Sequence, residues 1–523
     1  GVLPNSQYGA TLATEDARVF VGASEWDYRP QDPAPYGDIV GPGAVYVYDL
    51  SEVDIDGDTM PDLDEVTNGL DPSSASGDDG TAGDADLDGV TNGAELAAGT
   101  HATAPPANTR YFAEGATSTF FATELALLNP GSADADVLLR FQKAGGTASQ
   151  TRLLLPRGER RSIDVGAQAG MSQAEFATVI ESSAPIVADR VMQWPATSPY
   201  GSHGEHALTA PSTTWYLAEG ATHSGFDLFY LLQNPGTLDA TVRIRFLRPS
   251  GTPIEKDYSV PAGARVNVWV NVEQFPEGSG NLALASTDMS AVIESTNNVP
   301  IVVERAVYLT RPASTPGAPP TTFEAGHESA GVTAPSERWF FAEGATGSMF
   351  DLFILIANPS ALPATVRATY LLESGQTYQK THIVAAGSRF TIWVDHETFD
   401  GIDGTPLENV AVSTTLEVLN GVGVVAERAM WWPGPDFGTW SEAHNSPGAT
   451  VTASTWGVAA GRVTHDVPGE GNSDTYLLVA NPGDSTAYLT VTLVLDDGGG
   501  TEIRYLTAPP HSRLNIDVKA AFG

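Results

Sequence analysis

Apolar and polar residues alternate with a period of two along many short stretches of the chain. In residues 241–246 and 265–270 every second residue is apolar, so each stretch buries one face if it forms a β-strand. Glycine or proline interrupts the pattern about every 8–12 residues, which is the rhythm of antiparallel strands joined by turns. No stretch shows a helical periodicity of useful length. The pattern therefore predicts an all-β fold.

A seven-residue pattern recurs and divides the chain into repeats. It starts with an aromatic residue and continues x-Ala-Glu-Gly-Ala-Thr, at 111–117, 216–222 and 340–346, with a weaker copy from Trp456 that has Ala460 in place of the glutamate. Each copy leads into an apolar strand that ends in Asn-Pro, and these asparagines are 105, 124 and 123 residues apart. They are Asn129, Asn234, Asn358 and Asn481. The spacing suits one sandwich of about seven strands, so we expect tandem immunoglobulin-like β-sandwiches.

An acid-arginine pair closes each of the first three repeats on an apolar strand. The pairs are Asp189-Arg190, Glu304-Arg305 and Glu427-Arg428. Because buried charges need partners, we expect each arginine to form a partly buried salt bridge with the glutamate of the Ala-Glu-Gly motif in the same repeat. Paired carboxylates also serve in catalysis, but an enzyme seldom repeats one active site three times along a chain. We therefore favour a structural role and predict no enzyme activity.

Composition narrows the class of protein. The 523 residues carry a formal net charge of −38 and include no cysteine. Such a charge repels nucleic acid and anionic membranes and attracts divalent cations, and no disulfide framework is available. No apolar run approaches the roughly 18 residues of a membrane span. We expect an extracellular, bacterial cell-surface or secreted protein that binds no nucleic acid and inserts no part of this segment into a membrane.

Two acidic loops, 30 residues apart, match the spacing of calcium-binding loops. Residues 84–95 read D-x-D-x-D-G-x5-E, and residues 54–65 form a near copy. Calcium prefers six to eight oxygen ligands, which alternate residues and a final glutamate supply. The first loop has Thr59 at the position of Gly89 and Gly57 two residues earlier, so we expect the two loops to bend differently. The alternative is a solvated acidic linker. The candidate Ca²⁺ ligands are Asp54, Asp56, Asp58, Met60 (backbone carbonyl), Asp62 and Glu65, and Asp84, Asp86, Asp88, Val90 (backbone carbonyl), Asn92 and Glu95.

Residues 54–100 resemble the type 3 thrombospondin calcium repeats of many bacterial surface proteins. The Gly69-Leu70-Asp71-Pro72 tail after the first loop extends the match, whereas Ala102 departs from it after the second loop. The resemblance implies that calcium rigidifies this segment and that the segment carries out no chemistry.

Two other resemblances concern the remaining chain. Residues 7–13, 19–23 and 43–48 resemble one FG-GAP blade of an integrin-type β-propeller, although the D-x-D-G-D loop common in such blades is missing. One blade cannot close a propeller, so we expect the blade to be the last of a longer protein or a small cap. The W-x-x-A-E-G repeat looks like the sandwich repeats of large bacterial exported proteins, which implies a fold but little about function.

These features give six segments. They are 1–50, an FG-GAP-like β fragment; 51–109, a calcium-binding type 3 thrombospondin-like linker; 110–210, 211–334 and 335–452, sandwich repeats 1 to 3; and 453–523, an incomplete sandwich repeat 4. Repeat 4 lacks the final acid-arginine strand, so we expect a truncated sandwich or one that receives a strand from another subunit. We expect loops rich in Pro, Ser, Thr and Gly between the repeats, at 195–214, 310–336 and 433–454.

Three short motifs suggest other chemistry. His203-Gly204-Glu205-His206 suggests zinc, but it lacks the spacing of a helical H-E-x-x-H site, so we expect a polar loop. Trp194, Trp431, Trp432 and Trp440 either stack on a sugar or, as is more usual, bury contacts between domains. Residues 436–440 match part of a sialidase Asp box, which is weak evidence because the match is short and isolated.

The function predicted from these features is structural: a calcium-rigidified stalk or a fibre subunit of a bacterial surface. The expected partners are further copies of the chain, head to tail, or other surface proteins. The alternative is an adhesin, or the carbohydrate-binding, non-catalytic part of a secreted enzyme, whose partner is a glycan.

Overall fold

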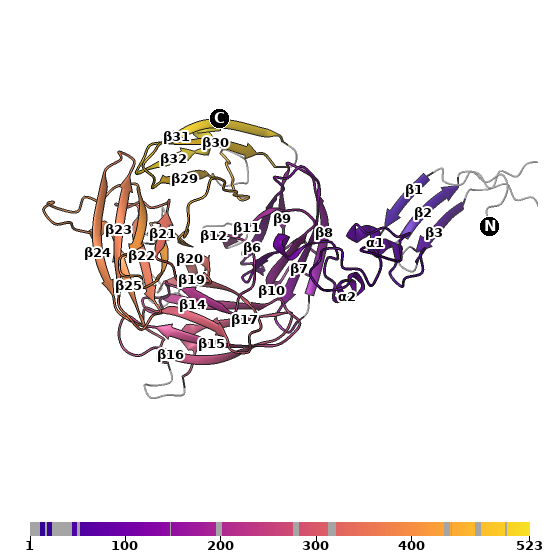
Figure 1. Cartoon of the computed structure of the whole chain (residues 1–523), viewed down its shortest axis with the longest axis horizontal. Helices are drawn as coiled ribbons and strands as arrows, with labels where there is room; N and C mark the ends of the chain where they lie inside the picture. The colour runs from indigo at the N-terminus through magenta and orange to yellow at the C-terminus, as the bar shows by residue number, and fades with distance from the viewer. Residues whose placement is uncertain are drawn as a thin grey trace, which may run out of the picture. The chain divides into compact units, whose positions relative to one another are not determined.

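The structure is a computed structural model of the chain (Figure 1). It describes residues 11–15, 18–23, 44–49, 53–146, 148–194, 201–275, 282–311, 321–433, 440, 442–465, 472–496 and 499–522. The chain divides into two compact units, which we describe separately. Unit 1 comprises residues 1–106 and 181–183, and unit 2 comprises residues 107–180 and 184–523.

Unit 1 contains a small sheet followed by the two acidic loops. Its antiparallel sheet has the order β1-β2-β3, from β1 (Thr11–Glu15), β2 (Arg18–Ala23) and β3 (Ala44–Asp49). The rest of the FG-GAP-like stretch lies outside the described residues. Each acidic loop runs into a short helix, α1 (Asp62–Asn68) or α2 (Asn92–Ala98), which ends at a glycine in the left-handed conformation.

Unit 2 is all-β, as predicted, and its repeats are sandwiches. Repeat 2 has two four-stranded antiparallel sheets of order β13-β18-β15-β16 and β17-β14-β19-β20. Repeat 3 has the same orders, β21-β26-β23-β24 and β25-β22-β27-β28, and repeat 1 has β4-β10-β7-β8, with β5 on β10, and β12-β11-β6-β9. In the described residues, repeats 2 and 3 each have eight strands, where the sequence indicates about seven.

The strand bounds are as follows. Repeat 1 has β4 (Arg110–Phe112), β5 (Ala116–Thr117), β6 (Ala122–Leu128), β7 (Ala135–Lys143), β8 (Ala148–Leu155), β9 (Arg160–Asp164), β10 (Ala174–Ser182), β11 (Val187–Trp194) and β12 (Gly201–His206). Repeat 2 has β13 (Thr214–Leu217), β14 (Phe226–Asn234), β15 (Ala240–Leu247), β16 (Ile254–Val260), β17 (Ala264–Trp269), β18 (Ser290–Ser295), β19 (Val302–Arg311) and β20 (Thr321–Ala330). Repeat 3 has β21 (Arg338–Phe341), β22 (Asp351–Asn358), β23 (Ala364–Leu372), β24 (Thr377–Val384), β25 (Ser388–Trp393), β26 (Val412–Val418), β27 (Val425–Trp432) and β28 (Glu442–Pro447).

The last strand of each complete repeat corrects one prediction. β12, β20 and β28 lie in the segments 195–214, 310–336 and 433–454, for which the sequence predicted loops. Each is the edge strand of its sheet, and the three edge strands pack against one another. Their alternation is hidden in the sequence because the residues that they bury include histidine, glutamate and asparagine.

The recurring motifs hold each sandwich together. The Asn234 side chain donates from Nδ2 to the Leu238 and Val260 carbonyls, at 2.8 and 3.0 Å, and accepts from the Gly236 N–H. The same contacts recur at Asn129, Asn358 and Asn481. The glycine of Ala-Glu-Gly is required by close packing, because a Cβ on Gly344 would lie 2.5 Å from the Val412 carbonyl oxygen. The asparagine of the Asn-Pro motif thus links separate backbone segments within each repeat by hydrogen bonds.

Repeat 4 has fewer strands in the described part of the chain. β29 (Tyr476–Asn481) pairs with β32 (Ser512–Asp517), β30 (Ala487–Val494) pairs with β31 (Thr501–Ala508), and α3 (Val518–Phe522) follows. Trp456 is 69% exposed, whereas the matching Trp215 and Trp339 are buried in complete sandwiches.

The four repeats contact one another in cyclic order. Arg265 of repeat 2 donates to the Gly115 carbonyl of repeat 1, Arg389 donates to Gly220, and Arg513 donates to Gly344. Arg160 of repeat 1 completes the cycle, because it donates to the Ala459 carbonyl of repeat 4 at 2.6 Å and pairs with Asp496 at 2.9 Å. In Figure 1 the yellow repeat 4 accordingly lies beside the purple repeat 1.

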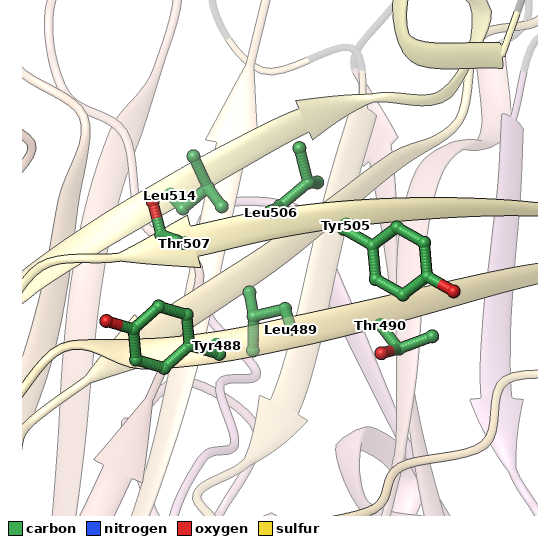
Figure 2. A pocket seen from close by; sticks show the side chains of 7 residues that line it. All are labelled: Tyr488, Leu489, Thr490, Tyr505, Leu506, Thr507 and Leu514. Atoms are coloured by element: carbon green, nitrogen blue, oxygen red, sulfur yellow. The ribbon is translucent and has the colours of Figure 1, made fainter.

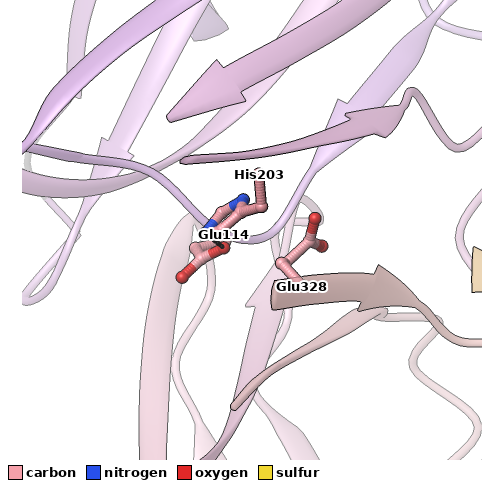
Figure 3. Close-up of side chains that lie close together, drawn as sticks. All are labelled: Glu114, His203 and Glu328. Carbon is pink, nitrogen blue, oxygen red and sulfur yellow. Dashed lines mark ion pairs between the residues drawn. The ribbon is translucent and has the colours of Figure 1, made fainter. Parts of the chain in front are cut away.

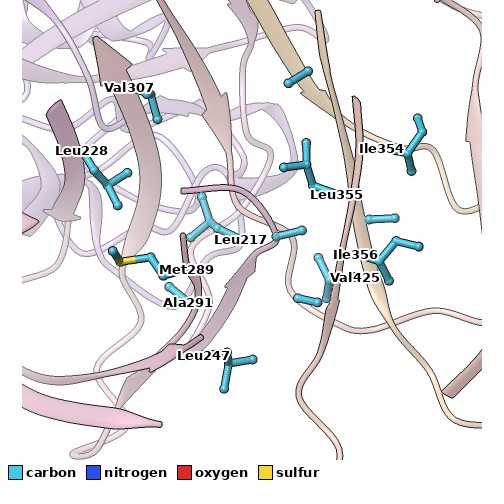
Figure 4. Close-up of a cluster of buried hydrophobic side chains, with 14 of the residues drawn as sticks. Leu217, Leu228, Leu247, Met289, Ala291, Val307, Ile354, Leu355, Ile356 and Val425 are labelled. Atoms are coloured by element: carbon cyan, nitrogen blue, oxygen red, sulfur yellow. The ribbon is translucent and has the colours of Figure 1, made fainter. Parts of the chain in front are cut away.

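Apolar side chains reinforce this cycle between repeats 2 and 3. One buried cluster contains Leu217 and Met289 of repeat 2 together with Leu355 and Val425 of repeat 3 (Figure 4). Because burial of an aliphatic side chain contributes about 1.5–3 kcal/mol, this shared cluster stabilises the packing of the two sandwiches against each other.

Candidate functional site

The two acidic loops of unit 1 have the same backbone shape. Both turn at two left-handed positions, Gly57 (φ 80°) and Thr59 (φ 82°) in the first loop and Leu87 (φ 63°) and Gly89 (φ 92°) in the second. The expectation that the loops bend differently is therefore wrong. Each loop has a glycine at only one of the two left-handed positions, and at the other it has a residue for which that conformation costs on the order of 1–2 kcal/mol.

Backbone N–H groups organise the loop carboxylates. In the first loop, Asp54 accepts from Gly57 N at 2.7 Å and from Thr59 N at 3.0 Å, while Asp58 accepts from Met60 N. The second loop has the same two contacts from Gly89 N to Asp84 and from Val90 N to Asp88, and its other donor to Asp84 is Asp88 N. One oxygen from each of Asp54, Asp56 and Asp58 lies within 4.8 Å of the others, and the same holds for Asp84, Asp86 and Asp88.

The remaining predicted ligands have different environments. The Asp62 carboxylate accepts from Ile55 N at 2.7 Å, and Asn92 accepts from Ala85 N at 3.1 Å, so both close their loops by hydrogen bonds. The Met60 side chain is buried in the small core with Leu70 and Ala102, whereas Val90 is 43% exposed. The backbone carbonyl of each residue could serve as a ligand whether its side chain is buried, as in Met60, or exposed, as in Val90.

The glutamates that end the two loops, Glu65 and Glu95, show whether the loops suit a cation. Glu65 is fully buried, and neither of its carboxylate oxygens has a hydrogen-bond partner. Glu95 is 4% exposed, and its Oε2 has no hydrogen-bond partner. Burial and the surrounding aspartates, Asp56 first, raise the pKa of Glu65 to about 7. Burial, then Asp86 and Asp88, raise the pKa of Glu95 to about 8. Buried carboxylates that face other carboxylates need a neutralising partner, and oxygen donors in this number fit Ca²⁺.

Unit 2 contains a second kind of site, where one repeat meets the next. The predicted salt bridges within repeats are present: Arg190 lies 3.7 Å from Glu114, Arg305 lies 3.2 Å from Glu219, and Arg428 pairs with Glu343. The arginines are at most 1% exposed. The sequence therefore predicted these pairs correctly.

The acid of each acid-arginine pair has a role that the sequence did not indicate. It accepts a hydrogen bond from a backbone N–H of the preceding repeat in the cycle. Glu304 of repeat 2 accepts from the Glu114 N–H of repeat 1, and Glu427 of repeat 3 accepts from the Ala218 N–H of repeat 2, both at 2.7 Å. Asp189 of repeat 1 accepts from Ala459 N and Ala460 N of repeat 4 at 2.6 Å. The recurrence of an acid beside each arginine is the sequence feature that could have indicated this contact.

We call Glu114, Arg190, His203, Glu304 and Glu328 the first junction, between repeats 1 and 2. Arg190 lies 2.8 Å from Glu304 and 2.5 Å from Glu328. His203 projects from β12 beside Glu114, and Glu328 projects from β20 (Figure 3). The expectation of a polar loop at His203 is wrong, because His203 lies in a strand and is 4% exposed. His206, at the end of the same strand, has a side chain that is 55% exposed, so the two histidines do not share a site.

Burial sets the protonation of the first junction. It lowers the pKa of His203 well below its usual value, and the Arg190 charge adds to this effect, so the ring is neutral. Burial raises the pKa of Glu328 well above its usual value against the attraction of Arg190. The first junction thus holds more carboxylate than its one arginine can neutralise.

We call Glu219, Arg305, His327, Glu427 and Asn445 the second junction, between repeats 2 and 3. Arg305 lies 2.5 Å from Glu427, and the His327 ring lies 3.2 Å from Glu219. Asn445 occupies the place of Glu328 and donates from Nδ2 to Glu219 at 2.7 Å. Burial raises the pKa of Glu219, but His327 and Arg305 outweigh burial and lower it. An amide donor here replaces the third carboxylate.

The tryptophans near the repeat ends are mostly buried contacts between repeats, as the more usual interpretation expects. Trp194 donates to the Phe323 carbonyl of repeat 2 at 2.6 Å, and Trp431 lies 5.0 Å from Phe226 of repeat 2. Trp432 and Trp440 are partly buried. Of the Asp-box-like motif, residues 436–439 lie outside the described residues.

Exposed tyrosines occur instead on repeat 4. Tyr488 is 86% exposed and Tyr505 is 79% exposed, on the paired strands β30 and β31. Figure 2 shows both rings on these strands together with Thr490 and Thr507. The four side chains line a hollow of about 440 Å³. Nothing in the sequence pattern singled out these residues.

Comparisons with known proteins assign no family. No family model and no curated protein match the chain. Two solved structures show partial similarity. "Crystal Structure of Thermotoga maritima 1070" is 18% identical with a TM-score of 0.18, and the match covers 22% of this chain and 94% of that one. "Anabaena sensory rhodopsin transducer" is 30% identical with a TM-score of 0.15, and the match covers 18% of this chain and 82% of that one. TM-scores this low carry no conclusion about function.

Among the described residues, no helix combines the length and the apolar character needed to cross a membrane.

Proposed function

We propose that the chain is a structural part of an extracellular bacterial surface protein, a stalk or filament segment stiffened by calcium. The observation that carries the proposal is the pair of buried glutamates, Glu65 and Glu95, which end two loops of like backbone shape and lie close to the loop aspartates. Bound calcium would supply positive charge and fix the backbone through carboxylate and carbonyl ligands.

The cyclic contacts of unit 2 support the structural part of the proposal. Recurrent polar groups of the repeats, the Asn-Pro asparagines and the acid-arginine pairs, bind backbone or neighbouring repeats rather than lining an open cleft. Such a unit resists deformation because many buried contacts break together. Calcium would act on unit 1, where the core is small and each loop gathers several carboxylates.

The experiment is a calcium titration of the full chain by calorimetry, paired with limited proteolysis of residues 53–104. We expect two calcium ions per chain and strong protection by calcium. The double variant Glu65→Gln and Glu95→Gln should lose both effects, while Glu255→Gln, on the exposed face of β16, should keep them. If calcium neither binds nor protects the wild-type segment, the proposal is wrong. Sedimentation velocity with calcium and with chelator then separates a filament, which assembles, from a stalk, which stays monomeric.

A second candidate function, glycan binding by an adhesin, rests on the exposed tyrosines of repeat 4. Aromatic faces beside hydroxyl groups suit sugar rings, and Tyr488 and Tyr505 each pair across the strands with a threonine. A glycan array tests this candidate. It compares the wild type with the double variant Tyr488→Ala and Tyr505→Ala, and with the control Thr241→Ala, which changes the residue of repeat 2 that matches Tyr488. Binding lost only in the tyrosine variant supports it, and no binding by the wild type rejects it.

A further inference from the structure

We infer that the first junction of unit 2 binds one divalent transition-metal ion, of the class of Zn²⁺ or Mn²⁺, through Glu114, His203 and Glu328. This site is separate from the calcium loops and does not depend on the proposed function. It would join repeat 1, which supplies Glu114 and His203, to repeat 2, which supplies Glu328.

The three side chains converge and each has a donor atom to spare. One ligand atom from each lies within 4.8 Å of the others, in a fully buried setting. Glu114 uses Oε1 to accept from the Tyr308 hydroxyl at 2.9 Å, while its Oε2 has no hydrogen-bond partner. Glu328 Oε2 pairs with Arg190 at 2.5 Å, while Oε1 is without a partner.

His203 is the independent observation that points to a ligand. Its side chain is completely buried, yet neither ring nitrogen makes a hydrogen bond, and Nε2 lies 3.5 Å from Glu114 Oε2. A buried polar group without a partner costs about 1–3 kcal/mol, and a metal ion bound at the nitrogen would remove that cost. The Trp194 ring, 5.3 Å from the imidazole, packs on His203 and holds it in place.

Charge balance favours a divalent ion. The first junction has one arginine and three buried carboxylates. Together with their charged neighbours Arg265 and Glu205, the groups here are two arginines and four carboxylates, so with every carboxylate ionised a charge of +2 makes the sum zero. At the second junction the third carboxylate is replaced by Asn445, which itself donates the hydrogen bond that a cation would otherwise provide to Glu219. The additional carboxylate of the first junction is therefore the feature that a metal would explain.

The donor set indicates the class of metal. One imidazole nitrogen and two carboxylates in a tight, enclosed cluster suit Zn²⁺ or Mn²⁺, which accept mixed nitrogen and oxygen ligands in low number. Calcium prefers six to eight oxygens, and Mg²⁺ keeps several waters, which a buried cluster of this size does not accommodate.

The test is binding of Zn²⁺, and of Co²⁺ as a spectroscopic probe, to the metal-stripped full chain with Ca²⁺ in excess. Metal is added both to the folded chain and during refolding from urea, so that a closed site is still loaded. We expect one Zn²⁺ at this site, with a visible Co²⁺ spectrum and a raised melting temperature. Glu328→Gln and His203→Gln should each lower the affinity by at least about 10–100-fold, since even loss of an outer partner has that effect.

Matched controls separate this site from surface histidines. His327→Gln alters the corresponding histidine of the second junction and should leave the affinity and the Co²⁺ spectrum unchanged. Glu328→Gln is nearly isosteric and resembles Asn445, so it should fold, as circular dichroism will check. The inference is overturned if the wild type binds neither ion by either route, or if both first-junction variants bind as the wild type does. The first of these results would mean that protons alone neutralise the cluster.

Discussion

The first and second junctions of unit 2 share one framework and differ in one residue. In both, an arginine of one repeat binds the glutamate of its own Ala-Glu-Gly motif and the acid of the next repeat, and a histidine lies beside that glutamate. Glu328 occupies the first junction where Asn445 occupies the second. The second junction is thus built with two carboxylates, and Glu328 gives the first junction a third, which also pairs with Arg190 of the neighbouring repeat.

The largest expected effect comes from removing the arginine at either junction. Arg190→Met leaves three buried carboxylates without their cation, and Arg305→Met leaves two, so both variants should lose about 3–5 kcal/mol of unfolding free energy. Arg190→Met should lose more in the absence of metal. Urea unfolding followed by tryptophan fluorescence measures both, and equal losses would show that Glu328 is neutral in the folded protein.

The next largest loss of unfolding free energy is expected when the second junction is given the third carboxylate of the first. Asn445→Asp replaces an N–H donor, 2.7 Å from Glu219, with a carboxylate oxygen. We expect a loss of about 3 kcal/mol, near the upper end for an unsatisfied buried group. Thermal unfolding at neutral pH measures the loss, with Asn445→Ser as the control that removes the donor without adding charge. An unchanged melting temperature would mean that this junction tolerates a third carboxylate.

The reverse change should matter little without metal. Glu328→Gln removes one ion pair with Arg190 but also one excess carboxylate, and Arg190 keeps Glu304 at 2.8 Å. We expect less than about 1 kcal/mol of change in the metal-free chain, because Arg190 is not left without an ion partner and one of three like charges is removed. Measured by the same unfolding experiment, a loss of several kcal/mol would show instead that Arg190 depends on Glu328.

The smallest effect concerns repeat 3, where Arg428 pairs with Glu343. Burial raises the pKa of Glu343, but Arg428 first and then His444 lower it, with a net value of about 2. A lowered carboxyl pKa contributes stability above the unfolded value of 4.5, and that contribution is lost as the pH falls towards 2. The stability difference between wild type and Glu343→Gln should therefore shrink from pH 5 to pH 2. A constant difference over that range contradicts the pairing.

Much of the local structure was predictable from the sequence. Strand periodicity, the repeat spacing and the Asn-Pro and Ala-Glu-Gly motifs indicated tandem sandwiches, and the acid-arginine pairs indicated buried salt bridges within repeats. The acidic loops were recognisable from their spacing, although their similar bend was not. Thr59 and Leu87 hold positive φ values that their residue types do not suggest, and the surrounding loop imposes them.

The strands β12, β20 and β28 were not predictable because their buried faces are polar. A pattern search for strands looks for alternating apolar residues, whereas His203, Glu328 and Asn445 are buried against charges from other repeats. Their burial is favourable only once the partners are in place, so no local pattern records it.

By itself, then, the sequence determined what each repeat does with its own residues, since alternation, turns and clamps act over short distances along the chain. Only the tertiary structure decided that repeat 4 contacts repeat 1 through Arg160 and Asp189, and that Glu328 joins Glu114 and His203 from another repeat. The physical reason is that a buried charge is stabilised by groups near it in space, and those groups lie more than 100 residues away in the chain.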